Sequence, residues 1–199
     1  MKNLVKLIVV SVVILFFTAC KNDKNQTDIK EEHSNEMNME NVHDMNGSST
    51  DMVTVQKSEL SNQIVERYLQ LKNALVSDNQ KKAVEAGKDL HRAFESFDMT
   101  QLNDAQHKEY MEIAENAKEH AEHIIKSDIN HQREHFEFLS TDINDLITLV
   151  GTNKTLYQDF CPMYNNNKGG TWLSETKEIK NPYFGNKMLN CGEIQKQIN

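Results

Sequence analysis

Apolar residues recur at helical spacing through the middle of the chain, from about residue 57 to residue 151. The intervals of three and four residues are those of one face of an α-helix, and four such stripes are separated by short polar breaks. The stripes comprise Ile64, Tyr68, Leu71 and Leu75; Ala83, Gly87, Leu90, Phe94 and Phe97; Tyr110, Ile113, Ala117, Ala121 and Ile124; and Phe136, Leu139, Ile143, Leu146 and Val150. Amphipathic helices with short connections pack against their neighbours in opposite directions, so the pattern predicts an all-α fold, an antiparallel four-helix bundle over 57–151.

The polar breaks contain residues that begin or end helices. Asp78-Asn79, Asn103 and Ser127-Asp128 supply short polar side chains that can accept from the first free N–H groups of the next helix. Gly151 stands where a C-terminal cap belongs. The breaks therefore support the same four helices as the apolar stripes.

The pattern changes on both sides of this helical region. Residues 152–199 gather both prolines, the single tryptophan and much of the asparagine and glycine, which predicts an irregular extension of loops that can include a short hairpin. Residues 20–56 are polar and lack aromatic residues, and their apolar residues show no period. Such a segment cannot bury enough surface to fold, so we predict a flexible tether there.

The N-terminal segment resembles an export signal. Lys2 and Lys6 precede an apolar run over 7–17, which is too short to span a bilayer as a stable helix. Thr18 and Ala19 then place small residues before Cys20, as in a lipoprotein cleavage site. We predict a signal peptide over 1–19 and a lipid on Cys20 that anchors an exported protein to the cell envelope, facing the periplasm or on the outer membrane. The alternative is an ordinary secretory signal with an incidental cysteine.

Charge and motifs exclude several classes of function. The net charge of −8 argues against a nucleic-acid binder, which would carry a basic face. It also gives no attraction to anionic lipid head groups, so anchoring would depend on the acyl chains. The sequence contains no Cys-x-x-Cys, no glycine-rich phosphate loop and no Gly-x-Ser-x-Gly elbow. We therefore do not expect an enzyme.

Two Cys/Met pairs stand near the ends of the C-terminal extension. Cys161 and Met163 flank Pro162, and Met188 precedes Cys191 by three residues. Two thiolates and two thioethers form a soft donor set that suits Cu(I) or Ag(I) better than Zn(II). A Cys161–Cys191 disulfide is the competing interpretation, since it would close a loop of about 30 residues and stabilise the extension by roughly 3–4 kcal/mol. Two free buried thiols are the third.

Histidines and methionines elsewhere could also bind metal. The tether holds a cluster that offers imidazole and thioether ligands for copper, or that merely reflects the composition of a polar tail. Its members are His33, Met37, Met39, His43 and Met45. On the predicted helices, His120 and His123 are three residues apart, and His131 and His135 are four apart. Each pair shares a helix face and could chelate an ion, although solvated or otherwise partnered histidines are the plainer interpretation.

Several segments together resemble one known family. They are 68–76, 132–136 with 139–140, 161–163, 168–170, 172–174, 179, 181–185, 188 and 191–192. This set, over about residues 58–195, resembles the domain of unknown function 3347. That family occurs as exported single-domain proteins and as domains fused to adaptor subunits of copper and silver efflux pumps. The resemblance therefore implies handling of heavy metals outside the cytoplasm, and it adds His135 to the candidate ligands because His135 lies inside a family-like motif.

From the sequence we expect a lipid-anchored copper-binding protein, with a heavy-metal efflux adaptor as its partner and no organic cofactor. The expected ligands are Cys161, Met163, Met188, Cys191 and His135. The alternative is a helical interaction or scaffold module of an envelope complex, stapled by the disulfide and free of metal.

Overall fold

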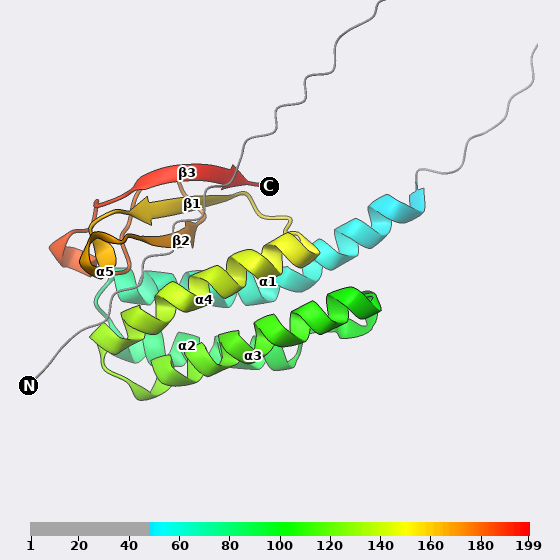
Figure 1. The fold of residues 1–199 in the computed structure, drawn as a ribbon, viewed down its shortest axis with the longest axis horizontal. Helices are drawn as coiled ribbons and strands as arrows, with labels where there is room; N and C mark the ends of the chain where they lie inside the picture. Colours follow the sequence, from blue (N-terminus) through cyan, green and yellow to red (C-terminus); the bar gives the residue numbers. More distant parts are fainter. Residues whose placement is uncertain (1–47) are drawn as a thin grey trace, which may run out of the picture. The chain divides into compact units, whose positions relative to one another are not determined.

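The computed structural model describes residues 48–199, which form four long helices followed by a small antiparallel sheet (Figure 1). The helices are α1 (Ser48–Val76), α2 (Gln80–Glu95), α3 (Asp104–Lys126) and α4 (Ile129–Val150), with a short helix η1 (Met99–Gln101) between α2 and α3. Helix α1 thus begins at Ser48, before the predicted start of the helical region at residue 57. The predicted signal peptide, the lipidated Cys20 and the cluster over 33–45 lie outside the described residues. Within 48–199, none of the helices has the length and apolar character that crossing a membrane would require.

Local capping fixes where α2, α3 and α4 begin and where α4 ends. The Asn79 side chain accepts from the Lys82 N–H at the start of α2. Asn103 and Gln106 form a reciprocal capping box at the start of α3, and Asp128 caps α4. Gly151 ends α4 with a φ of 78°, a left-handed conformation that suits glycine. These positions match the breaks predicted from the sequence.

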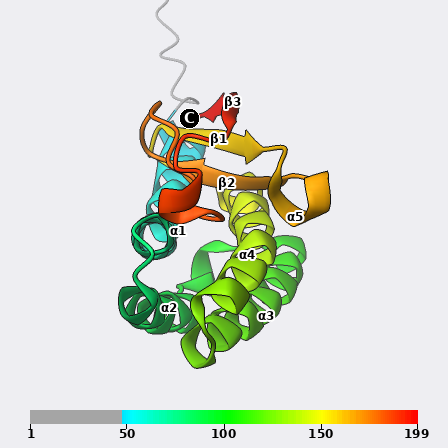
Figure 2. The same ribbon diagram turned by 90° about the vertical axis from the view of Figure 1, so that its left-hand side faces the viewer.

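The four helices pack as neighbours in a ring: α1 against α2, α2 against α3, α3 against α4, and α4 against α1. Every residue of the predicted apolar stripes is buried except Phe97, which is partly buried and stacks on Tyr110 with ring centroids 4.1 Å apart. The stripes therefore point into a shared core, as their periodicity predicts. Figures 1 and 2 show three layers: the sheet, α1 with α4, and α2 with α3.

The C-terminal extension is ordered into a sheet, so the expectation of an all-α chain with an irregular extension is wrong in that part. The strands are β1 (Leu156–Cys161), β2 (Gly170–Ser174) and β3 (Glu193–Ile198), antiparallel in the order β2-β1-β3. Short helices α5 (Tyr164–Asn167) and η2 (Gly185–Lys187) lie in the connections. Buried and exposed residues alternate little along these strands. Asp159 is buried within β1, and most of β3 is exposed.

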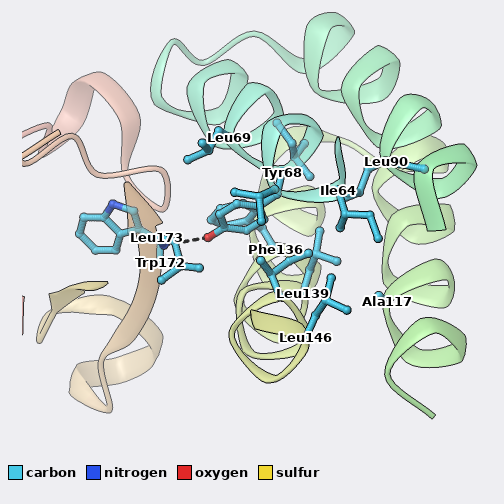
Figure 3. Packing of buried hydrophobic residues seen from close by; sticks show 14 of the residues in the cluster. Ile64, Tyr68, Leu69, Leu90, Ala117, Phe136, Leu139, Leu146, Trp172 and Leu173 are labelled. Atoms are coloured by element: carbon cyan, nitrogen blue, oxygen red, sulfur yellow. Dashed lines mark hydrogen bonds between the residues drawn. The ribbon is translucent and has the colours of Figure 1, made fainter. Parts of the chain in front are cut away.

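Buried hydrogen bonds attach the sheet to the helices. The Tyr68 hydroxyl of α1 accepts from the Leu173 N–H of β2 at 3.0 Å (Figure 3). It also bonds the Ser140 hydroxyl of α4 at 2.8 Å. Trp172 and Leu173 of β2 are both buried against the helical layer. Because a buried N–H without an acceptor is costly, this contact fixes the position of β2 on the helices.

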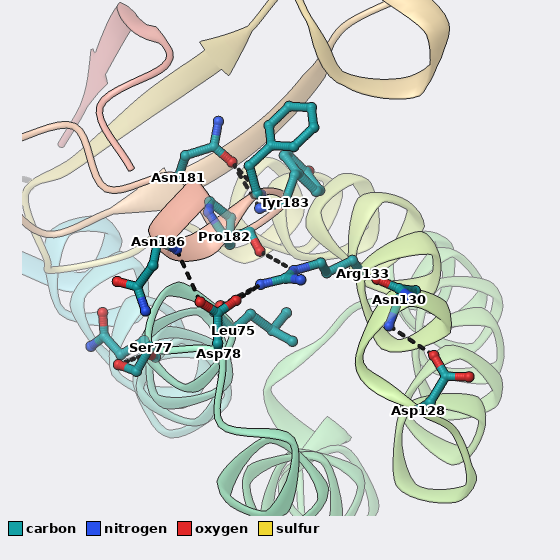
Figure 4. A network of polar contacts seen from close by, with 12 residues as sticks. Leu75, Ser77, Asp78, Asp128, Asn130, Arg133, Asn181, Pro182, Tyr183 and Asn186 are labelled. Carbon is teal, nitrogen blue, oxygen red and sulfur yellow. Dashed lines mark hydrogen bonds and ion pairs between the residues drawn. The ribbon is translucent and has the colours of Figure 1, made fainter. Parts of the chain in front are cut away.

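A second junction uses the guanidinium of Arg133 on α4. It donates to the carbonyl oxygens of Leu75 and Pro182, at 3.0 and 2.9 Å, and to the Asp78 carboxylate (Figure 4). Asp78 also accepts from the Asn186 N–H at 3.0 Å. The end of α1, the start of α4 and the loop before β3 are thereby held together.

Candidate metal centre

Four histidines meet where α3 ends and α4 begins. His120 and His123 lie in the last two turns of α3, and His131 and His135 lie in the first two turns of α4. Only residues 127 and 128 separate the two helices, so the chain reverses at once and sets these turns side by side. The two pairs that share a helix face in the sequence therefore become one cluster in the structure.

Three of the four histidines can direct one nitrogen each to a common point. The ligand atoms of His123, His131 and His135 all lie within 4.8 Å of one another. His135 Nε2 is 3.2 Å from His131 Nε2. The rings of His123 and His135 are stacked in parallel, with centroids 4.1 Å apart. His123 is exposed, whereas His131 and His135 are partly buried, so the cluster is open to solvent on the His123 side.

The fourth histidine lies behind this group. His120 Nδ1 is 3.1 Å from His135 Nδ1, so His135 has a histidine neighbour at each ring nitrogen. On its other side, His120 Nε2 lies 3.9 Å from the Asp142 carboxylate. That Asp142 oxygen is buried and has no hydrogen-bond partner among the described residues. The ring of His120 also stacks on Phe138 at a centroid distance of 5.3 Å.

The environment keeps the inner imidazoles neutral. Burial, together with the neighbouring His123, His131 and His120, lowers the pKa of His135 to about 4. Burial also lowers the pKa of His120. The imidazole that binds a metal is the neutral one, so at neutral pH these rings need not lose a positive charge before they bind. Burial and the nearby Asp145 raise the pKa of the Asp142 carboxyl to about 7.

A carboxylate orients His131. The Glu134 carboxylate lies 2.7 Å from His131 Nδ1, so it accepts the Nδ1 proton. This leaves the His131 Nε2 lone pair facing His135. A carboxylate behind a metal-binding histidine has the same effect in known metal sites.

The predicted Cys/Met residues are only partly brought together. Cys161 ends β1 and Cys191 precedes β3, and their sulfur atoms lie 2.6 Å apart although the residues are 30 positions apart. Burial and the Cys161 thiol raise the pKa of Cys191 to about 11. Met163 and Met188 are 51% and 37% exposed. The cysteines therefore form an adjacent pair, which fits a disulfide or a shared soft ion, and both methionines remain accessible.

Sequence reasoning placed His135 among the ligands but did not join it to His123 and His131. The signal was present, since two pairs at helical spacing flank a two-residue break. Asp142 gave no such signal, because an aspartate on a helix is usually solvated. The cluster that contains His135 includes neither cysteine.

Comparison with known protein families identifies a match in the helical region. Residues 64–155 match the model of a family described as "Protein of unknown function (DUF3347)". The match runs from α1 through α4 and ends just before β1, so it includes all four histidines and neither Cys161 nor Cys191. No curated protein and no solved structure matches the chain.

Proposed function

The chain belongs over residues 64–155 to the DUF3347 family, which has no assigned activity, and we propose that it is a copper-binding protein of the cell envelope. The observation that carries the proposal is the convergence of His123, His131 and His135 on one point. We propose these three as the metal ligands, with the four helices acting as an antiparallel bundle that holds the last turn of α3 against the first turn of α4.

The spacing of the donors fits a metal ion. Two metal–nitrogen bonds of about 2.0–2.1 Å at a tetrahedral angle place the nitrogen atoms roughly 3.3 Å apart. His131 Nε2 and His135 Nε2 are already 3.2 Å apart. His123 is exposed, and a rotation of its side chain would turn a ring nitrogen toward the same point. The centre therefore needs little rearrangement to offer three nitrogen ligands.

The chemistry of these donors favours copper among common ions. Imidazole suits Cu(II), Zn(II) and Ni(II), and at a nitrogen site Cu(II) binds most tightly of the divalent first-row metals. The adjacent thiols of Cys161 and Cys191, with Met163 and Met188 nearby in sequence, offer a second, softer site for Cu(I) or Ag(I). Because the pKa of Cys191 is raised to about 11, protons compete with the ion and binding there should weaken as pH falls.

The cellular setting is proposed from the sequence. The apolar run over 7–17 followed by Cys20 supports export and a lipid anchor. A polar tether with its own Met/His cluster would let the domain reach a neighbour, and the family resemblance points to an adaptor of a copper or silver efflux pump. In this proposal the protein receives and passes on metal and catalyses no reaction.

A second candidate function is a helical scaffold module that binds no metal. It is favoured by the 2.6 Å separation of the cysteine sulfur atoms, since a disulfide there would staple the sheet. The histidines would then be surface groups at the end of the helices.

Competitive copper titration separates the two functions. The purified protein is titrated with Cu(II) in air and with Cu(I) under anaerobic reducing conditions, against chelators of known affinity. The proposal predicts about one tightly bound Cu(II), which is lost in His131→Ala and His135→Ala and retained in His107→Ala, a control on the exposed face of α3. Equal affinity in all four proteins would remove the site from these histidines, and a wild-type protein that binds no copper would leave the scaffold as the better account.

A further inference from the structure

We infer that His120 and Asp142 are positioning residues, which act through His135 and prepare its Nε2 to bind metal. This inference rests on the proposed function and deepens it. Its basis is a continuous line of polar atoms: His131 Nε2 to His135 Nε2 at 3.2 Å, His135 Nδ1 to His120 Nδ1 at 3.1 Å, and His120 Nε2 to the Asp142 carboxylate at 3.9 Å.

The first part of the argument concerns the protons on this line. A contact of about 3 Å between two ring nitrogens needs one donor and one acceptor. The Glu134 carboxylate fixes the His131 proton on Nδ1, so His131 Nε2 accepts and His135 Nε2 donates. His135 Nδ1 then accepts from His120 Nδ1–H. In the metal-free protein, His135 therefore carries its proton on the nitrogen that would bind the ion.

Metal binding requires the other tautomer of His135. With Nε2 free of its proton, His135 must carry a proton on Nδ1, and that N–H needs an acceptor in a partly buried place. His120 Nδ1 is the acceptor within reach, provided that His120 carries its own proton on Nε2. That Nε2–H then points to Asp142. The two Nδ1 atoms thus remain paired with each other in either combination of tautomers.

Asp142 is suited to the far end of this chain. Its side chain is only 13% exposed, and the oxygen that faces His120 has no partner among the described residues. An unpartnered buried carboxylate oxygen is costly and calls for an explanation. The 3.9 Å distance is too long for a hydrogen bond, and a shift of about 1 Å would close it. Acceptance of the His120 Nε2–H in the loaded protein is the role that this oxygen fits.

Phe138 limits the alternatives for His120. Its ring stacks on His120 at 5.3 Å, and the His135 ring lies at 5.3 Å on the neighbouring α4 turn. The imidazole of His120 therefore packs against two rings that lie 6.5 Å from each other, and both contacts favour its present orientation. It remains placed to pass a hydrogen bond from His135 to Asp142.

The test combines imidazole NMR with metal affinity. Long-range nitrogen–proton correlation spectra of protein labelled with ¹⁵N-histidine report the tautomer of each ring, with Zn(II) alone as a diamagnetic probe. We expect His135 to change from Nε2–H to Nδ1–H on addition of Zn(II), and His120 to change in the same titration from Nδ1–H to Nε2–H. An unchanged His120 tautomer in Zn(II)-loaded protein would overturn the inference.

Affinity measurements use matched controls. His120→Phe and Asp142→Asn should each weaken Zn(II) binding by about 10–100-fold, the usual effect of losing a partner behind a ligand. His107→Phe and Asp104→Asn, both at exposed positions on α3, should leave the affinity unchanged. The double variant should lose little more than the worse single variant, because both residues act through one chain.

The outcomes distinguish this inference from the proposed function. If wild type binds Zn(II) and Cu(II) while His120→Phe and Asp142→Asn match their controls, the positioning role is wrong and the three-histidine centre stands. If wild type binds neither ion, the proposed function falls and the inference with it. If the circular dichroism spectrum of His120→Phe differs from that of wild type, this variant is misfolded, and the tautomer change in the wild-type protein then decides whether His120 has the positioning role.

Discussion

Arg133 provides the sharpest test of how the C-terminal sheet is joined to the helices. Its guanidinium is 8% exposed and donates to the Leu75 and Pro182 carbonyl oxygens and to Asp78. Arg133→Met keeps the length and apolar stem of the side chain and removes every one of these donors. The variant therefore tests the hydrogen bonds rather than the packing.

The expected loss follows from the groups left behind. A buried acceptor without its donor costs about 1–3 kcal/mol, and two carbonyl oxygens, of Leu75 and Pro182, are affected. The Asp78 carboxylate is 38% exposed and can be solvated again, so it adds little. Removing a buried charge from the folded state offsets part of the total. We expect a net decrease of about 2–4 kcal/mol in the free energy of unfolding.

Urea unfolding followed by circular dichroism measures this change, with Arg92→Met as the control. Arg92 is paired with Asp89 on the surface of α2 and is 70% exposed, so its loss should change stability by less than about 0.5 kcal/mol. A loss under about 1 kcal/mol for Arg133→Met, or equal losses in the two variants, would refute the reasoning.

Three further predictions address the sheet contact, the buried acid and the anchor. Tyr68→Phe should lower the unfolding free energy by about 1–3 kcal/mol, because the buried Leu173 N–H loses its acceptor. Chemical denaturation measures this loss, with Tyr157→Phe at a partly exposed position as the control. The pKa of Asp142 is about 7 in the folded protein against an ordinary value of 3.8, so its ionisation destabilises the fold as pH rises from about 4 to 7. Asp142→Asn should therefore raise the Tm of the metal-free protein at pH 7 and leave it unchanged near pH 4; a gain of equal size at both pH values would contradict this origin. Cys20→Ser should release the protein from membranes or leave it unprocessed, and palmitate labelling of that variant would refute the lipid site.

The helical part of the fold was predictable because its signals are local. Periodic apolar positions and cap residues such as Asn103 and Asp128 act within a few residues of themselves. The sheet gave no such signal. Asp159 interrupts β1 with a buried carboxylate, Trp172 and Leu173 are adjacent and both buried, and β3 is largely exposed. These strands are specified by contacts with the helices, which a single sequence does not reveal.

The sequence predicts the two histidine pairs of the candidate site, but it does not predict that the pairs meet. The spacing of His131 and His135 puts them on one helix face, and the polar break before α4 predicts a turn. The packing of α3 against α4 determines which face of α3 lies beside His131 and His135. That packing brings His120 and His123 into the cluster. The two cysteines came together across 30 residues as the sequence suggested, and their chemistry stays a prediction.

Pulsed electron paramagnetic resonance of the Cu(II)-loaded protein shows whether these histidines bind the ion, because it detects the remote nitrogen of each coordinated imidazole. We expect modulation from more than one imidazole in wild type. We expect loss of that signal in the variant that replaces His123, His131 and His135 by alanine, and no change in Cys161→Ser/Cys191→Ser. The same imidazole signal in wild type and in the triple histidine variant would contradict a metal centre between α3 and α4.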